Sequence, residues 1–370
     1  MEERGIKNSD FCSKTLDDLL HQAVLDGVFP GAVVLGAVGN AALFHQAYGW
    51  ANVFTRQPMD VETVFDLASL TKPLATTLAI LTLIDERRIG LDQSVASILQ
   101  WFGTAGKSRI TIRQLLTHRS GFPAHRPYFE KVNHLNAIEA TCQVRKWLTD
   151  EPLINSPGCQ TVYSDLGFMV LAWVVETVTQ QQLSDWVAAH IYAKSGIGDK
   201  LFFPAIQDIK RQRNYAATEL CPWRKRVLEG IVHDDNAFVM GGGGGHAGLF
   251  GTAYGVWNLL RILLQDAQGK GKSRLLSAPL AKLLFQRDAQ SDRPIGMDSP
   301  APVGPSCGHS FPPTAVGHLG FTGTSFWMDP NKERIVILLT NRVHPSRDNS
   351  KIRCFRPPFH DAMMAVLGEL

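Results

Sequence analysis

Strand-forming segments at the two ends of the chain, with a long helical stretch between them, restrict the fold most strongly. Near the N-terminus, "AVVLGAVGNAALFHQAYGWAN" predicts two strands joined by a Gly-Asn turn. Near the C-terminus, "GTSFWM" and "RIVILLTNR" flank "DPNKE", which indicates a hairpin. Residues 90–235 carry mostly helical patterns separated by Pro/Gly loops. The chain therefore predicts an α+β fold, in which an antiparallel β-sheet carries a helical insertion.

Helical patterns also lie outside the two strand regions. Apolar residues at helical spacing predict an amphipathic helix near residues 16–24, and "FHDAMMAVLGEL" predicts a short helix at the C-terminus. A chain of 370 residues suits one large domain or two closely packed lobes. We expect a single domain over 1–370, with a sheet lobe near 14–75 and 235–370 and a helical lobe near 76–234.

Composition and charge exclude several classes of function. The formal charge of +3 is too small for a nucleic-acid-binding surface, and no run approaches the roughly eighteen apolar residues of a membrane span. The six cysteines are widely spaced without a CxxC pair, which favours free thiols in a reducing compartment. The first residues, "MEERGIKNSDFCSK", contain no apolar core of a signal peptide. We expect a cytoplasmic protein with no nucleic-acid or membrane partner.

The segment "DLASLTKPLATTLAIL" places Ser69 three residues before Lys72 at the start of an apolar run that predicts a helix to about Glu86. On a helix both side chains would share one face, and Pro73 is tolerated only in the first turn. A desolvated lysine tends to lose its proton and could then accept the proton of a serine nucleophile. The alternative is an N-cap serine followed by a surface lysine.

Two further segments carry side chains suited to such a site. In "CQTVYSDLGFMVLAWVV", Tyr163 and Asp165 precede an apolar helix. A tyrosine beside Lys72 would have a lowered pKa and could shuttle the serine proton, although Ser164 or Asp165 could simply cap the helix. In "VGHLGFTGTSFWMDP", His318 and Gly320 lead into the terminal hairpin. A glycine there allows close backbone approach, so the N–H of Phe321 could face an oxyanion; the alternative is a sheet histidine beside a glycine bulge.

In this order and at these separations the three segments resemble the class C β-lactamase and penicillin-binding-protein-like family of serine hydrolases, with its S-x-x-K, Y-x-N and K/H-x-G motifs. That family also includes family VIII-type esterases and D-aminopeptidases. "LLTHRSG", "GHAGLF" and "VILLTNRVHP" are similar to other segments of its members, so the resemblance extends from about residue 16 to 345. It implies an antiparallel sheet flanked by the N- and C-terminal helices, an inserted helical lobe, and a cleft between them.

The resemblance also implies roles for the matching residues. Ser69 would be the acylated nucleophile, Lys72 its proton acceptor, and Tyr163 the relay to the leaving group and to water. The backbone N–H groups of Ser69 and Phe321 would form the oxyanion hole. His318, Gly320 and Asp165 would contact substrate.

The sequence departs from the family pattern at two positions. Asp165 stands where the second motif usually ends in asparagine, and a carboxylate there would hold Lys72 charged or repel an anionic substrate. Leu319 replaces the usual threonine, and His318 is titratable where many relatives carry lysine. In relatives these positions help bind a substrate carboxylate, and exported relatives carry a signal peptide. The departures favour a cytoplasmic esterase or amidase acting on a less anionic substrate.

A segment rich in histidine, aspartate and glycine could be a metal site or a loop. "IVHDDNAFVMGGGGGHAG" gathers His233, Asp234, Asp235 and His246, but without a recognised metal-ligand spacing we expect a solvated loop, no metal and no cofactor. The glycine run could instead line the cleft. His118 in "LLTHRSG" is interpreted as a structural helix-end residue.

Three functions remain open on the sequence alone. The leading one is a serine hydrolase with an acyl-enzyme on Ser69, acting on a small-molecule ester or small amide. The second keeps the mechanism with a β-lactam or a D-alanyl-D-alanine peptide as substrate. The third is a non-catalytic binding module of the same fold, which would require Lys72 or Tyr163 to lie beyond hydrogen-bond reach of Ser69.

Overall fold

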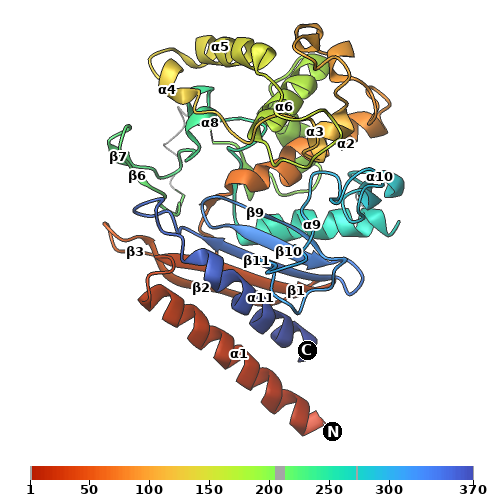
Figure 1. Ribbon diagram of the computed structural model, residues 1–370. Helices are drawn as coiled ribbons and strands as arrows, with labels where there is room; N and C mark the ends of the chain where they lie inside the picture. The colour runs from red at the N-terminus through yellow and green to blue at the C-terminus, as the bar shows by residue number, and fades with distance from the viewer. Residues whose placement is uncertain (1, 205–212, 272–273, 370) are drawn as a thin grey trace.

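An antiparallel sheet of six strands lies above the two terminal helices in the computed structural model (Figure 1), which describes residues 2–204, 213–271 and 274–369. Strands from both ends of the chain meet at its centre, where β1 pairs with β11. The predicted α+β layout and both predicted hairpins are therefore confirmed. In spatial order the strands are β3 (Gln57–Pro58), β2 (Ala41–Asn52), β1 (Gly31–Val38), β11 (Arg334–Thr340), β10 (Ser325–Asp329) and β9 (Val316–Leu319).

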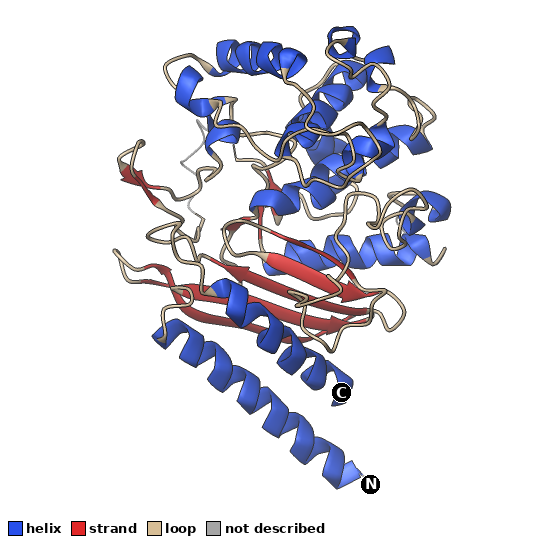
Figure 2. Cartoon of the chain, in the orientation of Figure 1, coloured by secondary structure: helices blue, strands red, loops and turns tan. Residues whose placement is uncertain are grey.

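Helices cover both faces of this sheet, which explains why its central strands are apolar at nearly every position. On one face Val34 and Leu338 pack against the terminal helices α1 (Glu2–Leu25) and α11 (Ile352–Glu369), which lie side by side (Figure 2). On the other face Leu35 and Ile337 join the core that includes α9 (Ala253–Ala267). The sheet is thus the middle layer between the terminal helices and the helical lobe.

The C-terminal helix differs from the prediction. It begins at Ile352, well before the expected segment, and contains Pro357 and Pro358. Proline normally interrupts a helix because it lacks the backbone N–H. Here Phe355, Phe359 and Met363 are buried against the sheet, so packing outweighs the local cost of the prolines.

The segment that carries Ser69 and Lys72 is less regular than predicted. A 3-10 turn over Ala68–Leu70 is followed by a π-helical stretch over Lys72–Thr77, and only Leu78–Asp85 is a regular α-helix, α2. The predicted end near Glu86 is confirmed. π-Helical turns are rare and are found mostly at functional sites.

The helical lobe forms the upper part of the molecule in Figure 1 and is built around the apolar helix α6 (Asp165–Thr179). Two small sheets, β4-β8-β5 and β6-β7, are separate from the large sheet. The described residues contain no helix with the length and hydropathy of a membrane span. The remaining elements are α3 (Ile112–Leu116), α4 (Phe129–Val132), α5 (Ala137–Asp150), α7 (Leu183–Val187), α8 (Asp235–Val239), α10 (Ala278–Lys282), β4 (Phe65–Asp66), β5 (Leu201–Phe202), β6 (Leu220–Cys221), β7 (Arg226–Val227), β8 (Phe250–Gly251), 3-10 turns over Val95–Ser97 and Gln100–Gly103, and a π-helical turn over Ala188–Tyr192.

The contact between the sheet and the terminal helices can be tested by truncating Leu338, whose side chain is fully buried on β11. Leu338→Ala should lower the free energy of unfolding by about 2–5 kcal/mol, because apolar contacts are lost and a cavity remains. Urea unfolding followed by circular dichroism measures the change. Leu43→Ala on β2 is the matched control: its side chain is 41% exposed, so a change of only about 0.5 kcal/mol is expected. Equal losses for the two variants would contradict the proposed packing.

Candidate active site

Lys72 is fully buried and lies one turn from Ser69, as the sequence predicted. Its ammonium Nζ donates to the Ser69 Oγ at 2.9 Å and to the carbonyl of His246 at 3.0 Å. It also forms an ion pair with the Asp165 carboxylate at 2.8 Å. Three acceptors therefore surround a group that has three N–H donors, and the geometry fits a charged ammonium.

The proton state of Lys72 differs from the prediction. Burial alone would lower the pKa of Lys72, but the Asp165 carboxylate and the Tyr163 phenol reverse this, and the net shift is upward. The expectation that the desolvated lysine loses its proton is therefore wrong, whereas the expectation that a carboxylate at Asp165 would hold Lys72 charged is confirmed. Burial likewise opposes ionisation of Asp165, yet Lys72 and His125 bring the pKa of that carboxyl well below its ordinary value.

Tyr163 meets both partners that the sequence assigned to it. Its hydroxyl lies within hydrogen-bond reach of Lys72 and Ser69, and the Lys72 Nζ is 4.9 Å from the centre of its ring. The lowered pKa expected for Tyr163 is wrong: burial raises the pKa of the phenol, and the nearby Lys72 only partly opposes this. Tyr163 is thus a neutral phenol between the lysine and the serine.

His118, interpreted from the sequence as a structural helix-end residue, also packs against Tyr163. The His118 ring lies 4.4 Å from the Tyr163 ring between centroids, and its Nδ1 accepts a hydrogen bond from the Ser164 N–H at 3.0 Å. Burial keeps the pKa of His118 well below its ordinary value, so the ring is a neutral acceptor. Ser164 also caps α6, so the capping and site interpretations of this segment both apply.

The turn that presents Ser69 is fixed by the residues before it. Ala68 has a positive φ of 48°, which is an unfavourable conformation for a residue with a side chain. The buried Asp66 carboxylate accepts the N–H of Ala68 at 2.8 Å and that of His233 at 2.6 Å. Asp66 therefore stabilises the strained residue next to Ser69, a role that no sequence motif indicated.

The third motif lies directly beside this turn. Thr322 and Thr324 donate hydrogen bonds from their hydroxyls to the carbonyls of Asp66 at 2.8 Å and Leu67 at 3.1 Å. A Cβ atom at Gly320 would lie 2.8 Å from the Leu67 carbonyl oxygen, so only glycine fits the close approach. Segments some 250 residues apart in sequence are thus joined beside Ser69.

Phe321 occupies the second position of the turn closed by the Gly323 N–H and the Gly320 carbonyl at 3.1 Å. That hydrogen bond does not use the N–H of Phe321. The assignment of this N–H and that of Ser69 to an oxyanion hole stays a prediction.

His318 reaches the site without a charge. Burial lowers its pKa to about 4, and its Nδ1 donates to the Leu319 carbonyl at 3.0 Å. Its ring centre is 6.0 Å from that of Tyr163. Neither His318 nor Leu319 therefore supplies the positive charge that the family's lysine would bring.

Two acidic side chains near Lys72 have histidine partners. The second oxygen of Asp165 lies 3.4 Å from the Nδ1 of the half-exposed His125, which the sequence did not single out. Asp234 accepts a hydrogen bond from the His246 Nε2 at 2.9 Å. His246 is the residue whose backbone carbonyl binds Lys72, so this pair fixes the segment around the lysine.

The segment that carries His233, Asp235 and His246 was expected to be a solvated loop, and this prediction is wrong. His233, Asp235 and His246 are buried, and their partners are protein groups: Glu219 for His233, Arg224 and Arg347 for Asp235. Within residues 2–204, 213–271 and 274–369, no group of three or more His, Cys, Asp or Glu side chains is arranged to hold a metal ion.

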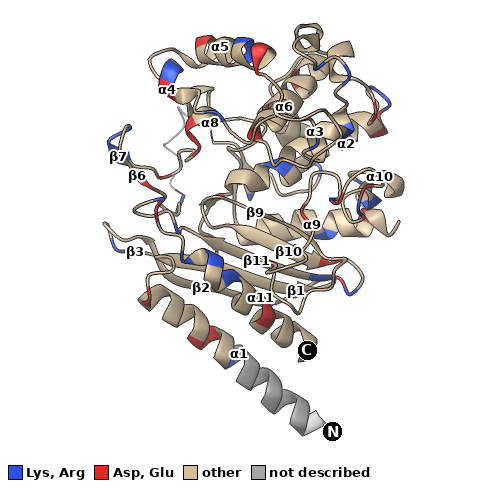
Figure 3. Ribbon diagram, in the orientation of Figure 1, with Lys and Arg blue, Asp and Glu red and all other residues tan. Residues whose placement is uncertain are grey.

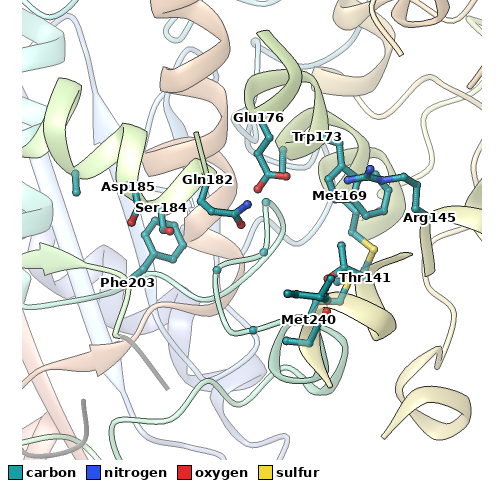
Figure 4. A pocket seen from close by; sticks show the side chains of 18 of the residues that line it. Thr141, Arg145, Met169, Trp173, Glu176, Gln182, Ser184, Asp185, Phe203 and Met240 are labelled. Atoms are coloured by element: carbon teal, nitrogen blue, oxygen red, sulfur yellow. Dashed lines mark hydrogen bonds between the residues drawn. The ribbon is translucent and has the colours of Figure 1, made fainter. Parts of the chain in front are cut away.

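The glycine run holds the lysine helix by its backbone. Thr76 donates to the Gly245 carbonyl at 2.6 Å, next to the Lys72 contact with His246. Gly241 and Gly243–Gly245 also line a cavity of about 870 Å³ between α5, α6 and α7, with Met169, Trp173 and Glu176 on its walls (Figure 4). Ser69, Lys72 and Tyr163 are not among the described residues that line it. The run therefore contacts the lysine helix through the Gly245 carbonyl, and its glycines line a separate cavity.

The described cysteines fit the predicted free thiols: Cys142, Cys159, Cys221, Cys307 and Cys354 form no disulfide. Cys12 lies among the residues whose side chains are outside the description. The cytoplasmic location and the two-lobe boundaries stay predictions.

Comparison with known proteins identifies the family of the chain. The family model described as Beta-lactamase matches residues 16–353. A protein of Escherichia coli O157:H7 named "Putative D-alanyl-D-alanine carboxypeptidase" is 32% identical over 367 residues, covering 91% of this chain and 84% of that protein.

Solved structures share the fold. EstCE1, described as a hydrolase with promiscuous acyltransferase activity, superposes with a TM-score of 0.72 at 22% identity, covering 94% of this chain and 98% of that one. Simvastatin synthase (LovD) from Aspergillus terreus superposes with a TM-score of 0.73 at 19% identity, covering 96% of this chain and 98% of that one. Since the family model spans most of the sequence and the E. coli relative most of both chains, the chain belongs to the Beta-lactamase family of serine hydrolases.

Proposed function

We propose that this protein hydrolyses an ester or small amide through an acyl-enzyme on Ser69, with Lys72 and Tyr163 as the pair that transfers the proton. The observation that supports this most directly is the 2.9 Å contact between the Lys72 Nζ and the Ser69 Oγ, with the Tyr163 hydroxyl in reach of both. The same contact argues against a non-catalytic binding module, which would need these groups to be apart.

In the resting site neither Lys72 nor Tyr163 can yet accept a proton from Ser69. Lys72 is charged and uses its N–H groups as donors, and Tyr163 keeps its proton. One proton must therefore leave the group formed by Lys72, Tyr163 and Asp165 before Ser69 can be activated. The Ser69 oxygen then attacks the carbonyl carbon and its proton passes to the Lys72–Tyr163 pair. That pair protonates the leaving group, and the reverse transfer activates water against the acyl-enzyme.

The developing oxyanion would be bound by the N–H groups of Ser69 and Phe321. Their placement is supported by the hydrogen bonds of Thr322 and Thr324, which join the two segments. Donors already oriented toward the developing charge lower the barrier without reorganisation at the moment of reaction.

A substrate with little negative charge is favoured by the chemistry of the third motif. His318 is neutral, with a pKa near 4, and Leu319 offers no hydroxyl. Asp165 is 20% exposed and would repel an anionic group near Lys72. An ester or a small amide without a carboxylate next to the scissile bond fits these surroundings best.

A D-alanyl-D-alanine peptide or a β-lactam is the second candidate, because the E. coli relative is named as a carboxypeptidase. Such a substrate needs a cation for its carboxylate. Arg293 is close enough to lower the pKa of His318 by its charge, but its guanidinium is paired with Asp298. The second candidate would require that pair to open.

The acyl-enzyme can be detected by intact-protein mass spectrometry after brief incubation with a p-nitrophenyl ester or, separately, with a penicillin. Wild-type protein should gain the acyl mass or release nitrophenolate, and Ser69→Ala should do neither, because the nucleophilic oxygen is absent. The reagent that reacts faster distinguishes the two substrate classes.

Thr71→Ser serves as a control beside the nucleophile, because its buried hydroxyl bonds to the Ala68 carbonyl at 2.6 Å and serine keeps that donor. It should retain acylation. Equal labelling of wild type and Ser69→Ala would contradict the assignment of Ser69.

The pH dependence tests the role of Asp165. Its carboxylate favours the protonated forms of Lys72 and Tyr163 and so raises the pKa values of both. Removing that charge in Asp165→Asn should lower both pKa values and move the rising limb of the kcat/KM profile to lower pH by at least about one unit. The measurement is ester hydrolysis between pH 5 and 11.

Asp234→Asn is the matched control, because it removes the same charge from a carboxylate that bonds to His246 rather than to Lys72. Asp234→Asn should move the rising limb of the kcat/KM profile to lower pH by less than Asp165→Asn does. An unchanged profile in Asp165→Asn, or a shift to higher pH, would show that Asp165 does not set the proton state of the site.

A further inference from the structure

Two buried arginines lie behind the turn that carries Phe321, and neither has a carboxylate partner among the residues that the structure describes. Arg342, which follows β11, is 9% exposed and Arg356, on α11, is 6% exposed. No ion pair joins either guanidinium to an Asp or Glu among the described residues, although basic residues gather at the start of α11 (Figure 3). Buried charges in proteins are ordinarily paired, so this arrangement requires an explanation.

Arg342 binds the turn at one point. Its Nε donates to the Phe321 carbonyl at 2.9 Å, and a second guanidinium nitrogen donates to the same oxygen. Its remaining donors bind the carbonyls of Arg347 at 3.0 Å and Asn349 at 2.6 Å. The guanidinium carbon also lies 4.6 Å from the centre of the Phe321 ring.

The Phe321 side chain is held on a second partner although it is 51% exposed. Its ring stacks with that of His233, with 5.6 Å between centroids and 26° between planes. The backbone N–H of His233 bonds to Asp66, which also holds the residue before Ser69. Phe321 is therefore fixed both to Arg342 and to the segment that shapes the nucleophile turn.

Arg356 binds the other end of the turn. It donates to the Thr324 carbonyl at 3.1 Å and approaches that of Gly320 at 3.5 Å. Burial lowers its pKa to about 10, and the charge of Arg342 contributes, so the two cations lie close enough to repel each other. At neutral pH both remain charged, and among the described residues their hydrogen-bond partners are backbone carbonyls.

We propose that Arg342 and Arg356 are positioning residues of the oxyanion hole, which hold the Gly320–Thr324 turn so that the Phe321 N–H faces Ser69. Their charge, which no carboxylate among the described residues neutralises, adds positive potential at the place where negative charge develops in the tetrahedral intermediate. The inference rests on the proposed function, because it assumes acyl transfer at Ser69. It explains why a costly pair of buried cations is kept at this turn: their stabilising partner is present only during the reaction.

Arg342→Gln tests the proposal through ester hydrolysis and through affinity for phenylboronic acid, which forms a tetrahedral adduct with a serine oxygen. The variant should lose about 10- to 100-fold in kcat while KM stays within about threefold, because a displaced N–H weakens the transition state more than substrate binding. Affinity for the boronic acid should fall with kcat. Arg342→Lys keeps the charge but not the forked geometry and should lose several-fold.

Arg353→Gln is the control, since it removes an exposed arginine from α11, the helix that carries Arg356, and should stay within about twofold of wild type. Circular dichroism checks that each variant folds. If Arg342→Gln does not fold, the kcat of Arg342→Lys is used to test the proposal instead. Wild-type kcat in the folded Arg342 variants, or a loss confined to KM, would overturn the inference while leaving the acyl-enzyme intact. A wild type that neither hydrolyses the ester nor is acylated would instead remove the proposed function itself.

Discussion

The ion pair between Lys72 and Asp165 is the interaction on which the site depends. A fully buried ammonium would be costly alone, and the carboxylate at 2.8 Å makes it stable as a cation. Because the lysine is then a donor, it orients the Ser69 hydroxyl and binds the carbonyl of His246. Under the proposed mechanism, this ordered resting state must lose a proton before Ser69 can react.

The fold brings distant parts of the chain to this pair. The terminal strands place Gly320 and Phe321 at the end of β9, and the hydroxyls of Thr322 and Thr324 bind the strand that leads into the nucleophile turn. From the helical lobe, α6 supplies Asp165 at its first residue, where the free N–H groups of a helix favour a negative charge. The site therefore needs both lobes, which explains why its three motifs lie so far apart in sequence.

Much of the fold could be predicted from the sequence, because apolar periodicity and turn signals are local, and the three short motifs do lie together in the folded chain. The proton states were predicted only in part. Asp165 holds Lys72 charged, as its carboxylate suggested, but the pKa of Tyr163 is raised rather than lowered, because deep burial outweighs the nearby ammonium. The supporting residues were also missed. Asp66 and His118 act through backbone N–H groups that only the folded chain brings to them, and the prolines in α11 are outweighed by packing that no local pattern encodes.

The most direct test of this account is a titration of Lys72 by NMR in protein labelled with carbon-13 and nitrogen-15 at lysine, with the signal assigned by its absence in Lys72→Met. The account predicts that the Lys72 side chain stays protonated through neutral and mildly alkaline pH, with a pKa above its ordinary value of 10.5. A midpoint near neutral pH would contradict it. Lys72 would then be a neutral base in the resting protein, and Asp165 would not govern the site.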